Sequence, residues 1–230
     1  TGTGNVAVGM QALENATTAN YNTAVGLQAL DTCTTGANNT SIGYYSSYSL
    51  TTGSKNTALG QSALQGCTDG VNNVAIGYEA GTADWADNNT AVGYRALKVN
   101  TSDNNTAVGS NALTANTTGS SNSALGYNAL TGNTTGLRNT ALGFAALVSN
   151  QTGNYNVAVG YDALGDYTGS NNTAVGNDAL KLCSTGNNNV AVGINAMDAN
   201  TTGASNTVVG ADTMRANTTG TDNTAVGKGA

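Results

Sequence analysis

The chain has no histidine and no proline, a single Phe, a single Trp and few charged residues of either sign. Without histidine, a Ser-His-Asp triad and the common zinc sites cannot be assembled. Seven basic residues are scattered over the sequence, so no basic patch can hold nucleic acid. No stretch reaches the roughly 18 apolar residues of a membrane-spanning helix. The composition predicts a protein that is not an enzyme, holds no cofactor or metal, and neither binds nucleic acid nor spans a membrane.

What fills the sequence is one short phrase, N-[T/V/S]-[A/S/V]-[V/I/L]-G-x-x-A-L, which recurs from end to end; residues 105–113 are one copy. Its glycine returns at an almost constant spacing, with steps such as Gly9 to Gly26 and slightly shorter ones such as Gly77 to Gly93, which gives fourteen copies. Such self-similarity is the signature of a stacked repeat protein. We therefore expect one repetitive domain over residues 1–230, cut from a longer protein. The repeat glycines are Gly9, Gly26, Gly43, Gly60, Gly77, Gly93, Gly109, Gly126, Gly143, Gly160, Gly176, Gly193, Gly210 and Gly227.

Positions in each copy are counted from its glycine, which is position 0. An asparagine occupies position −4 in every copy. Stacked copies bring equal positions on top of one another, and such columns of side-chain amides stabilise parallel strands. The repeat thus predicts a ladder formed by Asn5, Asn22, Asn39, Asn56, Asn73, Asn89, Asn105, Asn122, Asn139, Asn156, Asn172, Asn189, Asn206 and Asn223.

The local pattern predicts β-structure. The segment before each glycine is short and β-prone, and the residues from position +7 onward are turn formers such as Asn-Thr-Thr-Gly. The interval between one glycine and the next is too short for a helical hairpin. We expect each coil to be a strand, a glycine corner, a second short strand and a turn. The fold class is then all-β, a parallel β-roll or β-solenoid of about 14 coils.

Apolar residues occur in adjacent pairs, as at Ala107-Val108 and Ala112-Leu113. Neighbouring residues of a strand face opposite sides, and a thin roll has only one interior. The other apolar face must then be covered by another chain. The sequence therefore predicts chains packed side by side along their length.

Aromatic residues recur at position +1, where aliphatic residues such as Leu27, Met10 and Ile194 substitute for them. This column could stack on sugars or pack between chains, and the aliphatic substitutes favour packing. Tyr45, Tyr48 and Trp85 lie off the column, and we expect them to be exposed. The aromatic members of the column are Tyr44, Tyr78, Tyr94, Tyr127, Phe144 and Tyr161.

Three cysteines, Cys33, Cys67 and Cys183, share position +7, where other copies carry asparagine. Two copies separate Cys33 from Cys67, about 9.6 Å at a strand spacing of about 4.8 Å. A disulfide needs Cα atoms within roughly 7 Å, so we expect no bridge within the chain but small, half-buried residues at a corner.

Position +2 carries charged pairs in successive copies. Glu79 precedes Arg95 by one copy and predicts a surface salt bridge. Asp162 and Asp178 are likewise neighbours, about 5 Å apart by strand spacing, close to the separation in retaining glycosidases. The plainer interpretation is a pair of solvated surface acids. Asn-x-Thr triplets such as residues 133–135 fit glycosylation acceptors, although composition alone produces many of them.

The phrase at Asn89-Thr90-Ala91-Val92-Gly93-Tyr94-Arg95-Ala96-Leu97 resembles the head repeat of trimeric autotransporter adhesins (YadA-like) and, still more closely, repeats of phage-type tail-fibre proteins. The resemblance covers the whole chain. It implies a parallel homotrimer of left-handed β-rolls, exposed outside a cell or on a virion and used for attachment to a host-surface receptor or glycan.

Two alternatives stay open. A glycan-degrading tailspike would use the Asp162 and Asp178 pair, and an ice-binding solenoid would use the threonine columns. Ice-binding faces usually pair two threonine columns, whereas the column at −3 is single and is interrupted by Val74, Val157 and Val190.

Overall fold

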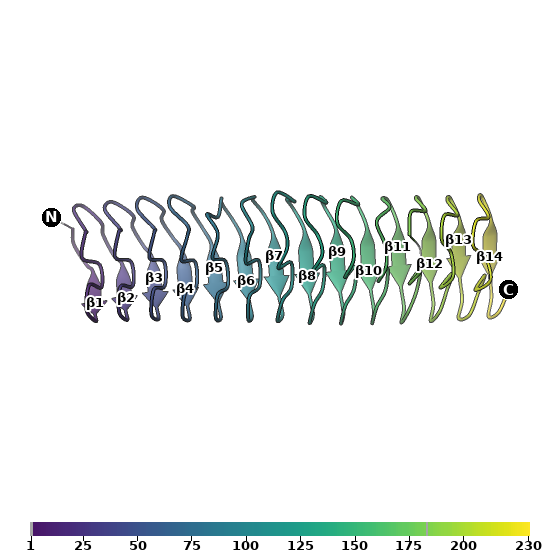
Figure 1. Ribbon diagram of the computed structural model, residues 1–230, viewed down its shortest axis with the longest axis horizontal. Helices are drawn as coiled ribbons and strands as arrows, with labels where there is room; N and C mark the ends of the chain where they lie inside the picture. Colours follow the sequence, from purple (N-terminus) through teal and green to yellow (C-terminus); the bar gives the residue numbers. More distant parts are fainter. Residues whose placement is uncertain (1, 183) are drawn as a thin grey trace. The chain divides into compact units, whose positions relative to one another are not determined.

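The computed structural model describes residues 2–182 and 184–230. The chain is all-β, a parallel β-solenoid of about 13 turns, with no helix among the described residues. Each copy of the repeat contributes one three-residue strand at positions −3 to −1 (Figure 1). One copy, from its strand to the start of the next, is called a rung.

The chain falls into two compact units, residues 1–117 and 118–230. The first holds β1 (Val6–Val8), β2 (Thr23–Val25), β3 (Thr40–Ile42), β4 (Thr57–Leu59), β5 (Val74–Ile76), β6 (Thr90–Val92) and β7 (Thr106–Val108). The second holds β8 (Ser123–Leu125), β9 (Thr140–Leu142), β10 (Val157–Val159), β11 (Thr173–Val175), β12 (Val190–Val192), β13 (Thr207–Val209) and β14 (Thr224–Val226). Within each unit, successive strands pair in parallel and in register, so that Ala24 lies opposite Ser41 and Ala141 opposite Ala158.

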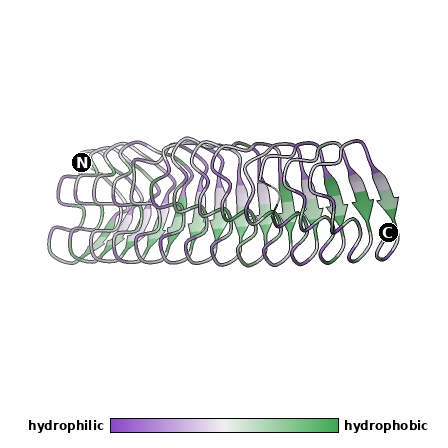
Figure 2. Ribbon diagram, turned by 45° about the vertical axis from the view of Figure 1, so that its right-hand side comes forward, coloured by the Kyte–Doolittle hydropathy of each residue, from purple (hydrophilic) through white to green (hydrophobic). Residues whose placement is uncertain are grey.

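From β2 to β13, each strand buries only its middle residue. In β6 and β11, for example, Ala91 and Ala174 are fully buried, while the residues on either side are half-exposed. This is the alternation expected of a strand. Figure 2 shows that the strands become more hydrophobic toward their arrowheads, because position −1 is apolar although it points out of the core.

The segment after each repeat glycine is a turn, and the expected second strand is wrong. The residues at positions +2 and +4 take left-handed backbone conformations; φ is 55° at Gln28 and 54° at Leu30. The paired left-handed residues curl the chain inward instead of extending it. As a result Ala112 and Leu113 are both fully buried in the same interior, rather than facing opposite sides. Only the strand pair, such as Ala107 and Val108, divides between inside and outside.

The asparagines at position −4 form a ladder of hydrogen bonds inside each unit. The backbone N–H of each donates to the side-chain oxygen of its counterpart one rung earlier, at 2.8–3.0 Å in the twelve steps from Asn5 to Asn105 and from Asn122 to Asn223. The side-chain Nδ2 reaches forward, as from Asn39 to the carbonyl of Gly53 at 2.9 Å. Each asparagine thus contacts the preceding ladder asparagine through its backbone N–H and the following rung through its side chain, which fixes the register of the rungs.

Replacing Asn156 with Ala is expected to lower the free energy of unfolding by about 2–5 kcal/mol, because two buried backbone groups lose a partner. These are the N–H of Asn172 and the carbonyl of Gly169, at 3.0 and 2.8 Å from the Asn156 side chain. The matched control is Asn171→Ser at the exposed position −5, where Ser121 occurs naturally. Urea denaturation measures both; equal losses would show that the ladder adds nothing.

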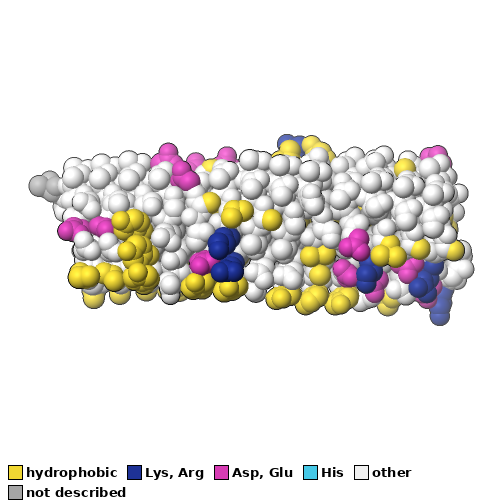
Figure 3. All heavy atoms as spheres, viewed as in Figure 1, with side chains coloured by type: hydrophobic (Ala, Val, Ile, Leu, Met, Phe, Trp, Pro, Cys, Tyr) yellow, Lys and Arg dark blue, Asp and Glu magenta, His cyan; other side chains and the backbone are white. Residues whose placement is uncertain are grey.

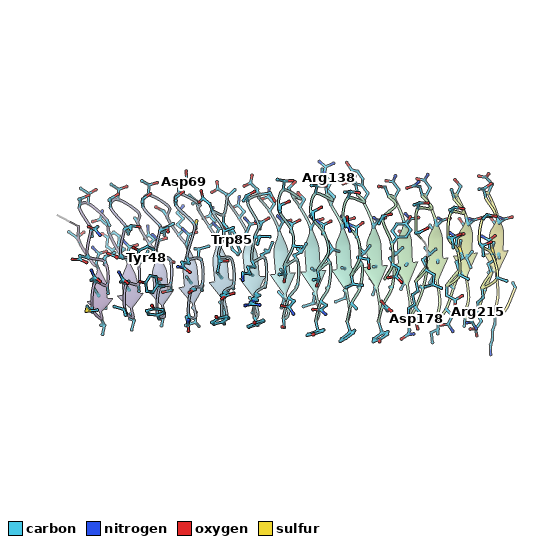
Figure 4. The ribbon with its side chains drawn as sticks, viewed as in Figure 1. Tyr48, Asp69, Trp85, Arg138, Asp178 and Arg215 are labelled. Atoms are coloured by element: carbon cyan, nitrogen blue, oxygen red, sulfur yellow. The ribbon has the colours of Figure 1, made fainter. Side chains whose placement is uncertain are left out.

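The core stays packed in rungs that lack the usual leucine at position +4, because another large side chain of the same rung takes its place. At position +4 of the β5 rung, Gly81 replaces leucine, and the indole of Trp85 fills the space, donating its Nε1–H to the carbonyl of Leu97 at 3.2 Å. Trp85 is only 1% exposed, so the expectation that it faces solvent is wrong (Figure 4). In the β3 rung, Ser47 replaces the leucine at +4 and Leu50 occupies +7; both are buried. Large and small residues exchange places within a rung.

Candidate interaction face

An exposed apolar stripe runs along each unit, formed by the side chains at positions −1 and +1. Position −1 is Val, Ile or Leu in every copy; position +1 is apolar or aromatic in most copies, polar at Gln61, Ser110 and Asn177, and charged at Lys228. Leu125 and Tyr127 of one rung are 49% and 48% exposed. The more exposed members are Val8, Met10, Ile42, Tyr44, Leu59, Tyr78 and Tyr94 in the first unit, and Leu125, Tyr127, Leu142, Phe144, Tyr161, Ile194, Val209 and Val226 in the second.

The space-filling view shows hydrophobic side chains gathered along one edge of each unit (Figure 3). The interior of the rungs is filled by other side chains, mainly the alanines and leucines at −2, +3 and +4. Contiguous apolar surface of this kind marks an interaction site in soluble proteins.

The aromatic rings of the stripe stack on one another. The ring centroids of Tyr78 and Tyr94 are 5.5 Å apart, and the ring planes are 9° from parallel. The ring centroid of Phe144 lies 5.1 Å from that of Tyr127 and 5.3 Å from that of Tyr161. The guanidinium of Arg95 covers Tyr94 at 4.9 Å from the ring centroid. A sugar needs a free ring face; stacking occupies both faces of Phe144 and one face of each of the other four rings. The geometry favours packing through the outward ring edges.

Tyr45 and Tyr48, expected to be exposed, are half-buried beside Tyr44. The ring centroids of Tyr44 and Tyr45 are 4.3 Å apart, and those of Tyr45 and Tyr48 are 5.0 Å apart. This local cluster borders the stripe in the β3 rung.

Ion pairs lie beside the stripe. The predicted bridge between Glu79 and Arg95 is confirmed, with Nε 2.9 Å from Oε2, and Lys98 adds a second contact at 2.7 Å. Hydrogen bonds from Lys98, Tyr78 and Arg95 hold the pKa of Glu79 at about 2. The groups are partly exposed, so each pair stabilises the fold by no more than about 1 kcal/mol.

Asp162 and Asp178 share one partner. The Nζ of Lys181 lies 2.8 Å from Asp162 and 3.0 Å from Asp178, and these hydrogen bonds raise the pKa of Lys181. Arg215 makes a similar cluster with Asp198 and Asp212, at 2.9 and 3.6 Å. Asp178 and Arg215 lie on the same edge of the second unit (Figure 4). Asp162 and Asp178, which the repeat spacing places in successive rungs, therefore form part of a surface ion cluster.

Two cysteines lie in the interior. Cys33 and Cys67 are free thiols and fully buried, rather than half-buried as expected. Burial raises the pKa of both, that of Cys67 to about 12, so neither is a thiolate near neutral pH. Cys183 lies outside the described residues.

The threonine hydroxyls of the turns are used within the fold. Thr17 and Thr51, at position +8, donate their hydroxyls to the carbonyls of Thr34 and Thr68 one rung on, at 2.9 and 3.0 Å. On the outer strand face, the threonines at −3 alternate with the apolar residues at −1. That face therefore carries a single threonine column.

Comparison with family models, curated proteins and solved structures finds no match. The resemblance to adhesin and tail-fibre repeats therefore stays a prediction. Among the described residues there is no cluster of three potential metal ligands, and none of their segments forms an apolar helix long enough to cross a bilayer.

Proposed function

We propose that this chain is a structural, adhesive part of a fibre, in which copies pack side by side through the apolar stripe. The observation that carries the proposal is the stripe itself. Position −1 is apolar and at least half-exposed in every rung, and most rungs add an apolar residue at +1, on units whose interiors are filled by their own side chains.

A second copy of the chain is the occupant that fits the stripe. The side chains of the stripe recur once per rung, at intervals of about 4.8 Å along the solenoid. Another chain with the same repeat presents side chains at the same interval. An unrelated globular surface has no such period. In line with the resemblance, the assembly is a parallel homotrimer of left-handed rolls.

The mechanism is mechanical. In-register strands, the asparagine ladder and hydroxyl bonds tie each rung to the next, which suits a stiff spacer. Located outside a cell or on a virion, such a spacer projects a receptor- or glycan-binding part toward a host surface, and its polar turns add contacts of their own.

The test is the oligomeric state in solution. We expect light scattering after size exclusion to give a mass of three chains. Leu125→Lys combined with Leu142→Lys is expected to shift that mass toward one chain, because charges in an apolar contact are desolvated without a partner. The matched control introduces two lysines at exposed positions outside the stripe, as Leu137→Lys combined with Thr152→Lys.

Circular dichroism checks that the rungs persist in both variants. A wild-type chain that is monomeric at micromolar concentration would refute the assembly. Equal dissociation by the control pair would show that the stripe is not the contact.

A further inference from the structure

The fold separates the Asn-x-[Ser/Thr] triplets of this chain into two groups. There are twelve such triplets, beginning at Asn15, Asn38, Asn39, Asn88, Asn100, Asn104, Asn116, Asn133, Asn150, Asn171, Asn200 and Asn217. Six of these asparagines, at 39, 100, 116, 133, 150 and 200, are 0–1% exposed, inside the core. A sugar on Asn116 or Asn133 would have to displace the interior of its own rung.

The exposed group lies mainly in one column. Asn38, Asn88, Asn104 and Asn171 all occupy position −5, all begin an Asn-Asn-Thr triplet, and all are exposed. Their φ angles are 59°, 59°, 61° and 61°, so the four share one backbone geometry. Asparagine tolerates this left-handed conformation better than most residues.

Their side-chain Nδ2 groups have no partner in the fold. Among the hydrogen bonds of residues 2–182 and 184–230, none uses the side-chain amide of Asn38, Asn104 or Asn171. Asn88 only accepts, at Oδ1, from Asn72 at 3.2 Å. By contrast, the exposed Asn15 donates its Nδ2 to the carbonyl of Asp31 at 2.9 Å.

The third residue of each triplet also reaches solvent. Thr40 and Thr106 are exposed, and Thr90 and Thr173 are half-exposed, while the asparagine between is buried in the ladder. The acceptor amide and the hydroxyl two residues later are therefore both accessible on a folded rung. The backbone N–H of the acceptor is engaged with the preceding rung, as from Asn171 to Asn154 at 2.9 Å, which modification of the side chain leaves intact.

We propose that Asn38, Asn88, Asn104 and Asn171 are acceptor sites for N-linked glycosylation of the folded chain. The donor is a nucleoside-diphosphate sugar. A bond forms between Nδ2 and C1 of the sugar, the bond from C1 to the diphosphate oxygen breaks, the nucleoside diphosphate leaves, and one amide proton is released. The acceptor asparagines lie at position −5, in the bend before each strand and outside the stripe formed by positions −1 and +1.

The experiment treats the folded, full chain with a soluble N-glycosyltransferase and UDP-glucose, and maps the product by mass spectrometry of peptides. We expect glucose on the four proposed residues and none on Asn116, Asn133 or Asn200. Asn188 is the natural control, because it has the same position and exposure and a φ of 58°, but its triplet ends in Val190.

Two variants exchange the hydroxyl between neighbouring rungs. Val190→Thr is expected to create a modified site at Asn188, and Thr173→Val to abolish the one at Asn171. Both residues occur naturally at position −3, so the rungs fold in either variant. Modification of the buried triplets to the same extent would overturn the proposal. So would an unmodified folded chain when the enzyme modifies a free peptide of residues 169–175.

Discussion

Replacing Trp85 with Ala is expected to lower the free energy of unfolding by about 3–5 kcal/mol, the range for removing a large aromatic from a core. The indole is 1% exposed and lies where other rungs carry the leucine of position +4. The Nε1–H bond to the carbonyl of Leu97 is lost as well. Urea denaturation followed by circular dichroism measures the loss.

The effect of Gly81→Leu on the free energy of unfolding is expected to change sign when Trp85 is replaced with Ala. In the wild type, a Cβ on Gly81 would lie 2.5 Å from Cε2 of Trp85, so Gly81→Leu overpacks the core and costs about 1–3 kcal/mol. Once Trp85 is Ala, the same leucine fills the cavity and restores about 2 kcal/mol. The backbone accepts it, because φ is 61° at Gly81 and 54° and 49° at Leu64 and Leu97 of the flanking rungs.

A control cycle combines Trp85→Ala with Leu30→Ala, three rungs away in the same unit. The two losses are expected to add, because the residues share no partner. If Gly81→Leu destabilises the Trp85→Ala variant as much as the wild type, then the indole of Trp85 does not occupy the space of the missing leucine at position +4.

The repeat made most of the fold predictable. A glycine at an almost constant spacing, an invariant asparagine and a β-prone triplet are enough to predict parallel rungs, and the structure shows one strand in each. The turn after the glycine could not be predicted from the pattern. Leucine at position +4 argues against a left-handed conformation by its own preference, and only the closure of a narrow rung imposes φ near 54° at Leu30.

The apolar pairs of the repeat predict the stripe only in part. Two apolar pairs in each copy suggested two apolar faces, but the Ala-Leu pair is entirely interior and only position −1, joined by +1, lies outside. The aromatic column says nothing of Trp85, which lies off it. The sequence does carry a signal for it, since the same rung lacks its leucine at Gly81. When one copy lacks its core leucine and carries a large apolar residue outside the repeat pattern, that residue is expected to fill the vacant core position.

Replacing the repeat glycine Gly60 with Ala is expected to cost about 4 kcal/mol or more, among the largest effects of any single change in the chain. Its φ of 134° lies in a region open essentially only to glycine, and forcing another residue there costs about 1–3 kcal/mol. The added Cβ would also lie 2.6 Å from the carbonyl oxygen of Gly77 and 2.8 Å from its carbonyl carbon. Both atoms are backbone, so relief requires the next rung to move.

Gly227→Ala separates the two causes. Its φ is 125°, yet nothing lies within 4 Å of the Cβ position, so only the backbone strain of about 1–3 kcal/mol should appear. Hydrogen exchange adds the spatial detail: Gly60→Ala should speed exchange at the neighbouring strand amides of β4 and β5, because rungs stabilise mainly their neighbours. Equal costs at the two glycines would mean that the close approach of successive corners contributes nothing, and that the glycine column serves backbone geometry alone.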